Sequence, residues 1–167
     1  MPTRHNFNLN EIFEIAEQIE RNGSEFYKRA AEKFTDSKDL HKLLLQLSDD
    51  ELKHEEIFRI YKERFAENST MVDDIDETVI KYLHALSRQY VFNNKVKNQV
   101  IDSSITKADV FRYAIEREKD AILFYIGLKD AMSDKKDKDA VDLLVEEEKR
   151  HLTELTKYTE IYQDLFE

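Results

Sequence analysis

DDELKHEEIF, residues Asp49 to Phe58, is a highly charged run that nevertheless continues an apolar helical stripe. With a period of about 3.5 residues, the inward positions of this segment are Leu44, Leu47, Glu51, His54, Phe58, Tyr61 and Phe65. Glu51 and His54 therefore take two successive core positions, whereas Glu55 and Glu56 fall outside the stripe. A carboxylate in an apolar interior costs several kcal/mol unless it is paired. The pattern thus predicts a helix whose glutamate and histidine point inward for a chemical reason.

The same stripe recurs near the C-terminus. Its inward positions there are Val141, Leu144, Glu148, His151, Leu155, Tyr158 and Tyr162. Glu148 follows Glu51 by 97 residues, and His151 follows His54 by the same interval. By itself a Glu-x-x-His pattern is a weak signal, because glutamate is abundant in this chain. Two copies in the same register with the core are a stronger one.

A second pair of segments is also repeated. The first has inward positions Phe13, Ala16, Glu20, Gly23 and Tyr27, and the other has Phe111, Ala114, Glu118, Ala121 and Tyr125. The interval between equivalent positions is 98 residues. These repeats indicate an internal duplication of a helical hairpin, over about 9–65 and 106–165. Each copy places one glutamate within its first helix and a Glu-x-x-His on its second.

Capping and turn residues give the expected helix boundaries. The expected helices run from a cap at Asn8 or Asn10 to about Phe34, from Ser37 to near Phe65, from Thr106 to about Met132, and from Ser133 to the C-terminus. A shorter amphipathic helix is expected over 75–92, followed by an irregular link over 93–104. Short turns make each pair of long helices an antiparallel hairpin. We therefore expect an all-α four-helix bundle, one domain over 1–167, with a crossover segment that carries the short extra helix between helices two and three.

Composition narrows the class of protein. Two glycines and one proline in 167 residues disfavour turn-rich β architectures, and the lack of cysteine excludes disulfides and thiolate metal sites. The net charge of −10 disfavours a nucleic-acid partner. No apolar run approaches the roughly 18 residues of a membrane span, and the N-terminus lacks the apolar core of a signal peptide. We expect a soluble, cytoplasmic protein with neither a membrane nor a nucleic-acid partner.

The four inward glutamates and two inward histidines suggest a metal site. Residues at i and i+3 lie on one helix face, about 5–6 Å apart at Cβ, so a glutamate and a histidine with this spacing can reach one ion. Four carboxylates at one depth repel one another, and two divalent cations would neutralise them. Carboxylate oxygens with one imidazole per ion suit iron or manganese. The predicted ligands are Glu20, Glu51, His54, Glu118, Glu148 and His151.

Four stretches also resemble a known family. IERNGSEFYKRAAEKF at 19–34, LSDDELKHEEIF at 47–58, AIEREKDAILFY at 114–125 and VEEEKRHLTEL at 145–155 are similar to the rubrerythrin-like branch of the ferritin-like superfamily. The resemblance covers nearly the whole chain and implies a ferritin-like bundle with two iron ions per chain, which manganese or zinc can replace. It implies that Glu51 and Glu148 bridge the ions, that Glu20 and Glu118 are terminal ligands, and that His54 and His151 supply nitrogen.

Two departures from the family matter. Rubrerythrins proper carry a cysteine-ligated rubredoxin domain that supplies electrons, and this sequence has no cysteine, so its electron donor is unknown. They also carry an extra glutamate one turn after the third-helix ligand, where this chain has Ala121. The family's movement of iron between two ligands on oxidation is therefore not expected here, and the site should be more symmetric.

Several other residues are weaker candidates than these six. Tyr27 and Tyr125 lie two turns from the glutamates, either as core aromatics or as groups that hydrogen-bond a ligand carboxylate. Glu116 should face away from the site, since it is two residues from the predicted ligand Glu118. The remaining histidines lack a matching glutamate and are expected at the surface: His5, His41 and His84.

The expected function is that of a rubrerythrin-like di-iron oxidoreductase. Two Fe(II) ions would give two electrons to hydrogen peroxide or dioxygen in a peroxidase- or ferroxidase-type reaction. The alternatives are iron oxidation for storage or delivery, and a structural helical bundle with vestigial ligands. A homodimer is expected because apolar residues of the short middle helix need a surface to cover: Ile80, Leu83, Leu86 and Val91.

Overall fold

The computed structural model describes residues 9–67, 75–92 and 104–161 of the chain. Its described residues form α1 (Leu9–Lys33), α2 (Lys38–Glu67), α3 (Glu77–Phe92), α5 (Lys107–Asp130) and α6 (Lys135–Ile161). The predicted all-α fold is confirmed, including the short extra helix between the two hairpins. The link at 93–103, the cap at Asn8 and the end of the fourth helix beyond Ile161 lie outside the described residues.

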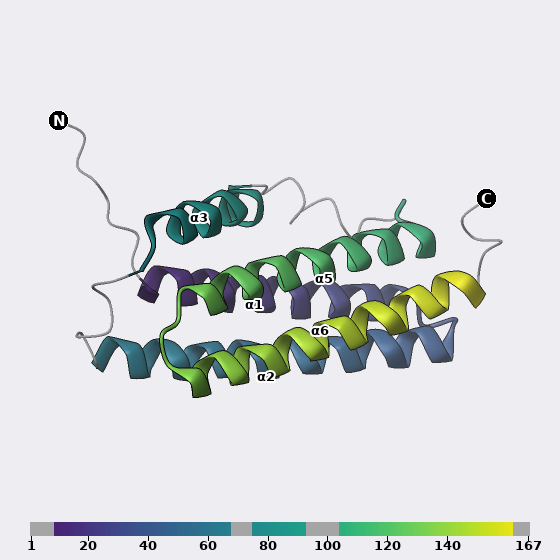
Figure 1. The fold of residues 1–167 in the computed structure, drawn as a ribbon. Coiled ribbons are helices and arrows are strands. Elements are labelled where there is room, and N and C mark those ends of the chain that lie inside the picture. The colour runs from purple at the N-terminus through teal and green to yellow at the C-terminus, as the bar shows by residue number, and fades with distance from the viewer. Residues whose placement is uncertain (1–8, 68–74, 93–103, 162–167) are drawn as a thin grey trace.

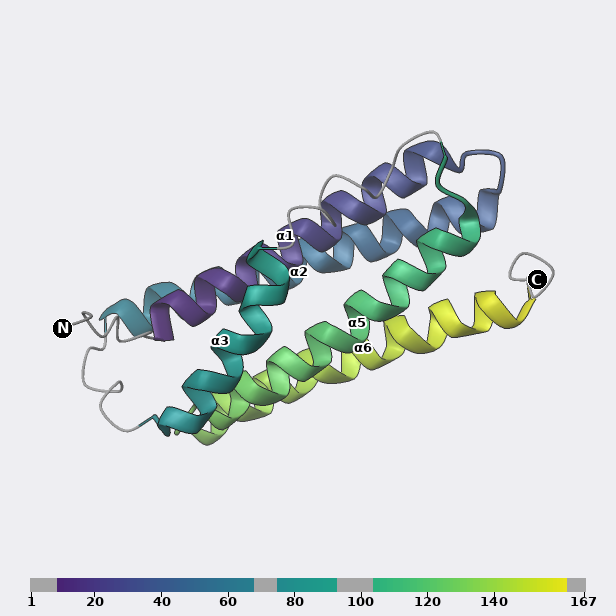
Figure 2. The same cartoon turned by 90° about the horizontal axis from the view of Figure 1, so that it is seen from above.

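The four long helices pack as two antiparallel hairpins, α1–α2 and α5–α6 (Figure 1). Seen from above, the two hairpins lie side by side (Figure 2). In Figure 1, α1 and α5 run in opposite directions on one side of the bundle, and so do α2 and α6 on the other. Two copies of one hairpin that are related by a twofold axis are expected to pack in this way.

Capping side chains determine where α5 and α6 begin. Thr106 caps α5, because its side chain accepts from the Asp109 N–H while the Asp109 carboxylate accepts from the Thr106 N–H. This is a capping box, which satisfies two otherwise unpaired donors. At the start of α6 the cap is Asp134, whose carboxylate accepts from the Lys136 N–H at 2.7 Å. The cap therefore lies one residue after Ser133.

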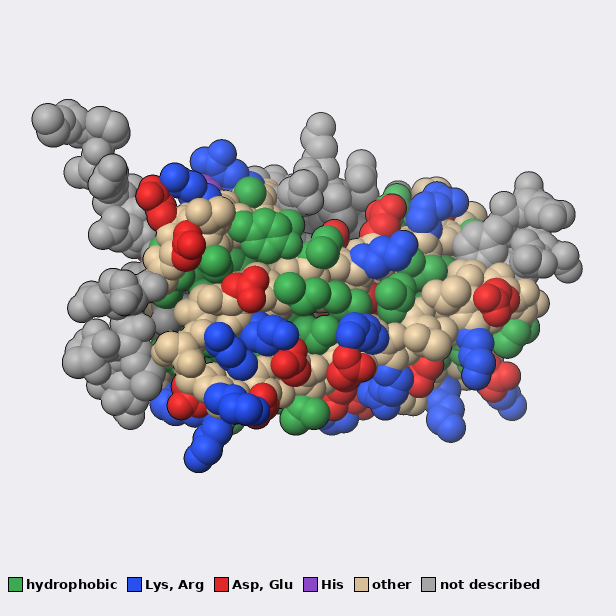
Figure 3. Space-filling view, viewed as in Figure 1, with side chains coloured by type: hydrophobic (Ala, Val, Ile, Leu, Met, Phe, Trp, Pro, Cys, Tyr) green, Lys and Arg blue, Asp and Glu red, His purple; other side chains and the backbone are tan. Residues whose placement is uncertain are grey.

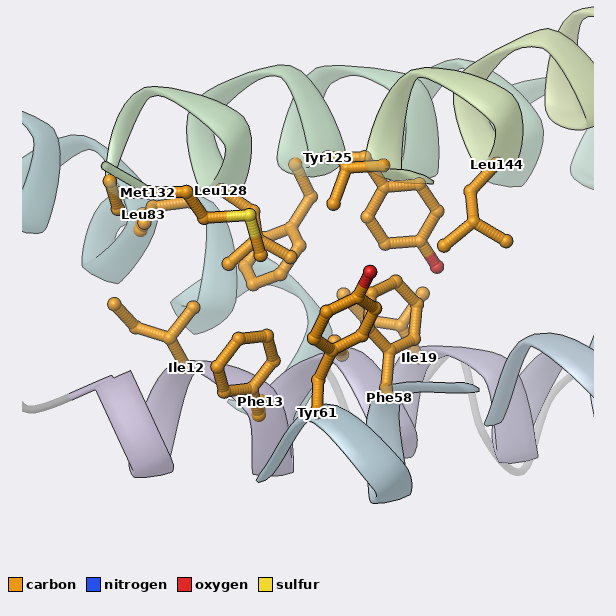
Figure 4. Close-up of a cluster of buried hydrophobic side chains, with 14 of the residues drawn as sticks. Ile12, Phe13, Ile19, Phe58, Tyr61, Leu83, Tyr125, Leu128, Met132 and Leu144 are labelled. Atoms are coloured by element: carbon orange, nitrogen blue, oxygen red, sulfur yellow. The ribbon is translucent and has the colours of Figure 1, made fainter. Parts of the chain in front are cut away.

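The short helix α3 lies across α1 and α5 near one end of the bundle (Figure 2). Its Leu83 is fully buried and packs into the core beside Leu128 and Met132 (Figure 4). Leu86 packs against the same core. The chain thus covers part of its own apolar α3 face, which removes Leu83 as an argument for a dimer. The side chain of Val91 lies outside the description.

Two apolar clusters make the core, and a polar layer separates them. One cluster includes Phe13, Phe58 and Leu144 and lies toward α3 (Figure 4). The other includes Tyr27, Leu44 and Phe111 toward the opposite end. The layer between them holds buried polar side chains from all four long helices: Glu20, Ser24, Ser48, Glu51, His54, Glu118, Glu148 and His151.

Candidate metal centre

The six residues predicted as ligands come together in this polar layer. Their potential ligand atoms form two groups, one of Glu20, Glu51, His54 and Glu148, the other of Glu51, Glu118, Glu148 and His151. Within each group the atoms all lie within 4.8 Å of one another. All six side chains are at least nine-tenths buried. Glu51 and Glu148 belong to both groups, so the two groups share two carboxylates.

Both histidines turn the same ring nitrogen toward the cluster. His54 Nδ1 lies 2.8 Å from Glu148 Oε1 and 3.7 Å from Glu20 Oε2. His151 Nδ1 lies 3.1 Å from Glu148 Oε2 and 3.7 Å from Glu118 Oε2. The two rings are 5.8 Å apart between centroids and nearly parallel. Each imidazole therefore faces one terminal and one shared carboxylate.

Several buried atoms of the cluster have no hydrogen-bond partner among the described residues. They are both carboxylate oxygens of Glu20, together with Nδ1 of His54 and Oε1 of Glu148, which lie 2.8 Å apart but are not aligned for a hydrogen bond. Burying such groups without a partner is costly. Carboxylate oxygens and an imidazole nitrogen that converge without hydrogen bonds fit a divalent cation, because a cation would satisfy all of them at once. The donor set is that of a dinuclear carboxylate metal site.

The electrostatics of the metal-free cluster are strained. Burial and the neighbouring carboxylates raise the pKa of Glu20 and Glu51 well above the usual value, and burial together with the Glu148 charge raises the pKa of Glu118 to about 7. Burial opposes protonation of the two histidines, but their carboxylate partners raise the pKa of His54 to about 9 and that of His151 to about 10. Without metal, bound protons thus carry the positive charge that the cluster needs.

Glu148 differs from the other carboxylates. Burial raises its pKa, but the hydrogen bond with His151 and the adjacent His54 imidazole outweigh burial, so its pKa lies below the usual range. Glu148 is therefore the carboxylate that stays ionised beside the two histidines.

Two carboxylates behind the histidines were not identified from the sequence. His54 Nε2 lies 2.7 Å from Glu147 Oε2, and His151 Nε2 lies 3.5 Å from Asp50 Oδ2. Glu147 is hydrogen-bonded to His54, an arrangement that fixes ring orientation in metal sites, whereas Asp50 is near His151 but His151 Nε2 has no hydrogen-bond partner among the described residues. Asp50 and Glu147 each precede a shared glutamate and are 97 residues apart, so the repeat itself was a signal that could have found them.

The surroundings of Asp50 and Glu147 differ. Asp50 is largely buried and pairs with Lys53 Nζ at 2.6 Å and Arg150 Nη2 at 3.4 Å. Burial raises its pKa, but the Lys53 hydrogen bond and nearby positive charges lower it overall. The side chain of Glu147 is half-exposed and pairs with His54. The site is therefore more symmetric in its ligands than in the groups behind them.

The two tyrosines also differ. The Tyr27 hydroxyl donates to Glu118 Oε1, which joins it to a predicted ligand of the other hairpin. Burial and the Glu118 charge raise the Tyr27 pKa well above its usual value, so the hydroxyl keeps its proton. The Tyr125 hydroxyl is buried without a hydrogen-bond partner among the described residues. Of the two, Tyr27 alone contacts the cluster as a hydrogen-bond donor.

The remaining candidates lie away from the cluster. Glu116 is exposed, as expected from its position two residues before Glu118. His41 is half-buried and its Nδ1 lies 2.8 Å from the Ala31 carbonyl oxygen, so the expectation of a surface group was wrong in part. His84 is also half-buried, and His5 lies outside the described residues. Ala121 is buried in the core beside the site.

A helical bundle with two groups of carboxylates and histidines that share two glutamates defines the class of ferritin-like diiron-carboxylate proteins. A crystal structure described as a ferritin-like diiron-carboxylate protein from Thermotoga maritima matches with a TM-score of 0.68 and 26% sequence identity, over 92% of this chain and 95% of the other. Residues 11–159 match the family model of rubrerythrin. The chain belongs to the rubrerythrin family. No curated protein matches it.

Proposed function

We propose that this protein binds two iron ions per chain and reduces hydrogen peroxide. The observation that carries the proposal is the sharing of Glu51 and Glu148 between two ligand groups, because a shared carboxylate holds two ions at one distance from each other. Membership of the rubrerythrin family supports iron as the metal. The similarity to a diiron-carboxylate structure supports it as well.

The donor set can hold two ions. Glu20 and His54 would hold one ion and Glu118 and His151 the other, with the two shared glutamates between them. Two bound Fe(II) ions would supply two electrons, which with two protons would convert one hydrogen peroxide into two waters and leave two Fe(III). An external donor of unknown identity must return the electrons. The four carboxylates balance the charge of two divalent ions.

The protein's own residues prepare the site. Glu147 holds the His54 ring through a hydrogen bond so that its Nδ1 faces the carboxylates. Tyr27 holds Glu118 through a hydrogen bond. The two apolar clusters on either side exclude bulk water, which strengthens the electrostatic interactions inside. These residues fix the geometry before an oxidant arrives.

The experiment compares oxidants on an anaerobically prepared protein loaded with two Fe(II) per chain. Stopped-flow absorbance in the near-ultraviolet follows oxidation by hydrogen peroxide and by dioxygen at equal concentrations. We expect the reaction with peroxide to be faster, and a small-molecule reductant to return the protein to its starting spectrum. The matched control is Glu51→Ala, which removes a shared carboxylate and should abolish both reactions.

Two results would overturn the proposal. If dioxygen is the faster oxidant and tens of irons accumulate per chain, the protein oxidises iron for storage. If neither oxidant changes the spectrum of a sample shown to hold two irons, the redox function fails. A bundle that binds no metal at all would be structural.

A further inference from the structure

The ligand atoms in the two halves of the metal centre differ in their hydrogen bonding. The Glu20 half, defined by Glu20 and His54, and the Glu118 half, defined by Glu118 and His151, share the other two glutamates. In the Glu20 half, both carboxylate oxygens of Glu20 and Nδ1 of His54 are buried without a hydrogen-bond partner among the described residues. Burying such atoms is costly, so this half gains most from an ion that pairs with them.

The ligand atoms of the Glu118 half are already paired. Glu118 Oε1 accepts a hydrogen bond from the Tyr27 hydroxyl, which orients Glu118 but also satisfies one of its oxygens before any ion binds. His151 Nδ1, the nitrogen that faces the cluster, is hydrogen-bonded to Glu148 Oε2 at 3.1 Å. Nδ1 cannot donate to Glu148 and bind an ion through its lone pair at the same time. An ion in this half must therefore replace that hydrogen bond.

The shared residue Glu148 shows the same difference within one side chain. Its Oε2 is hydrogen-bonded to His151, whereas its Oε1 lies 2.8 Å from His54 Nδ1 without the alignment of a hydrogen bond. An ion in the Glu20 half can contact Oε1 and the His54 nitrogen without displacing a hydrogen bond between them. The first ion to enter the centre therefore loses least in the Glu20 half.

The groups behind the two imidazole rings favour the same half. His54 Nε2 is hydrogen-bonded to Glu147 at 2.7 Å, which holds the ring with Nδ1 toward the cluster. His151 Nε2 has no hydrogen-bond partner among the described residues, and Asp50 Oδ2 lies 3.5 Å from it. Of the two halves, only the Glu20 half combines an imidazole oriented from behind with an Nδ1 that is free to bind.

We propose that the two halves of the centre fill in a fixed order, the Glu20 half first, and that filling of the weaker Glu118 half decides whether the protein can act. This inference rests on the proposed function and adds its dependence on the supply of metal. Reduction of one peroxide to two waters takes two electrons, and one Fe(II) gives one. A chain with an ion in the Glu20 half alone therefore holds half of the electrons that it needs.

Mn(II) alone is the probe, because the electron paramagnetic resonance signal of the free ion reports binding without any turnover. A titration up to one Mn(II) per chain gives the affinity of the first step. The duplication supplies matched controls: Glu118→Gln for Glu20→Gln, and His151→Ala for His54→Ala. We expect each variant of the Glu20 half to weaken the first step at least about tenfold more than its matched variant, which corresponds to about 1.4 kcal/mol.

The glutamine pair decides the outcome, because glutamine keeps the size of glutamate and its carbonyl oxygen can still accept from Tyr27. Equal losses in Glu20→Gln and Glu118→Gln, or a larger loss in Glu118→Gln, would overturn the order of filling even if peroxide oxidises the iron-loaded protein. An unmodified protein that binds no Mn(II) would overturn it as well. If the order holds but peroxide does not oxidise the protein loaded with two Fe(II), the order stands and the proposed peroxide reductase fails.

Discussion

Glu51 and Glu148 are the residues on which a dinuclear site depends, because each contributes to both ligand groups. Glu51→Ala should lose both ions, since neither half keeps its full set of donors. Glu56→Ala is the matched control on the same helix, where Glu56 is exposed and pairs with Arg59. Elemental analysis after anaerobic iron loading should find two ions per chain in the unmodified protein and in Glu56→Ala. One ion or none in the unmodified protein would disprove a dinuclear site.

Tyr27 and Tyr125 occupy equivalent positions but should respond differently to loss of the hydroxyl. Tyr27→Phe removes the donor to Glu118, and the loss of such a supporting contact costs about 10–100-fold in metal affinity. Tyr125→Phe removes a buried hydroxyl that has no partner within the described part of the chain, which should leave affinity unchanged and stability equal or higher. Competition titrations with a metal indicator measure both. Equal losses in the two variants would show that Tyr125 also supports the centre.

At the level of single residues, the sequence predicted what periodicity can reveal. Glu51 and His54 replace apolar residues in a stripe, so their inward orientation follows from register alone. Asp50 and Glu147 were missed for the opposite reason. Both lie off the apolar stripe, in positions that normally face water, and only the packing of one hairpin on the other brings them close to the histidines.

The helix α3 packs closely on α5 at Gly127. A Cβ there would lie 2.6 Å from Tyr82 Cε1 and 3.0 Å from Leu83 Cδ2, both on α3. Gly127→Ala gains about 1 kcal/mol of helix propensity but must displace these side chains, and such overpacking costs about 1–3 kcal/mol. We expect a net loss of about 1 kcal/mol in the free energy of unfolding. Faster amide exchange confined mainly to α3 should accompany it.

Tyr82→Ala provides the test of that mechanism, because it removes the closer of the two clashes. In the Tyr82→Ala background, Gly127→Ala should be less damaging than in the unmodified protein, and a double-mutant cycle measures the difference. Identical effects of Gly127→Ala in both backgrounds would mean that contact with Tyr82 does not limit the approach of α3 to α5.

Helices were predictable as elements, but the docking of α3 was not. The expected range of 75–92 agrees with α3 (Glu77–Phe92) because its apolar residues repeat with a helical period. Which surface it covers depends on contacts far apart in the sequence, and Leu83 is buried by residues of α1 and α5. The single glycine at 127 was a signal for this crossing, since a glycine within a helix permits close approach of another helix.

The whole chain has a surface that a second copy could cover. Hydrophobic side chains lie between charged ones on the face over α3 and α5 (Figure 3), and the large exposed ones there are Tyr82, Leu123 and Ile126. The homodimer stays a prediction, now resting on this face rather than on Leu83. Sedimentation that finds only monomer at micromolar concentration would contradict it.

None of the helices in the described ranges is both long and apolar enough to cross a membrane.

The stability of the metal-free protein should fall as the pH rises. Glu118 has a pKa of about 7 in the folded protein against an ordinary 4.5, His54 about 9 and His151 about 10 against 6.5. A group with a raised folded-state pKa binds its proton more tightly when folded, so its contribution is complete below the ordinary pKa and is lost as the pH passes the raised one. The loss should therefore extend from about pH 5 to about pH 10. Glu148, with a lowered pKa, is ionised throughout this range and does not oppose it.

Metal should reverse this dependence, because ions replace the protons that the cluster binds when it is empty. A ligand at 100 times its dissociation constant adds about 2.7 kcal/mol for one site, and the gain should grow with pH as competition from protons at His54 and His151 disappears. Thermal melts at pH 6, 8 and 9.5 with and without Mn(II), in oxygen-free buffer because alkaline Mn(II) is oxidised by air, measure both effects. The metal-free melting temperature should decrease across the series, and the metal-dependent increase should be largest at pH 9.5. Melts that coincide with and without metal at every pH would mean that the cluster does not bind the ion, and the protein would then be a bundle that tolerates buried carboxylates without using them.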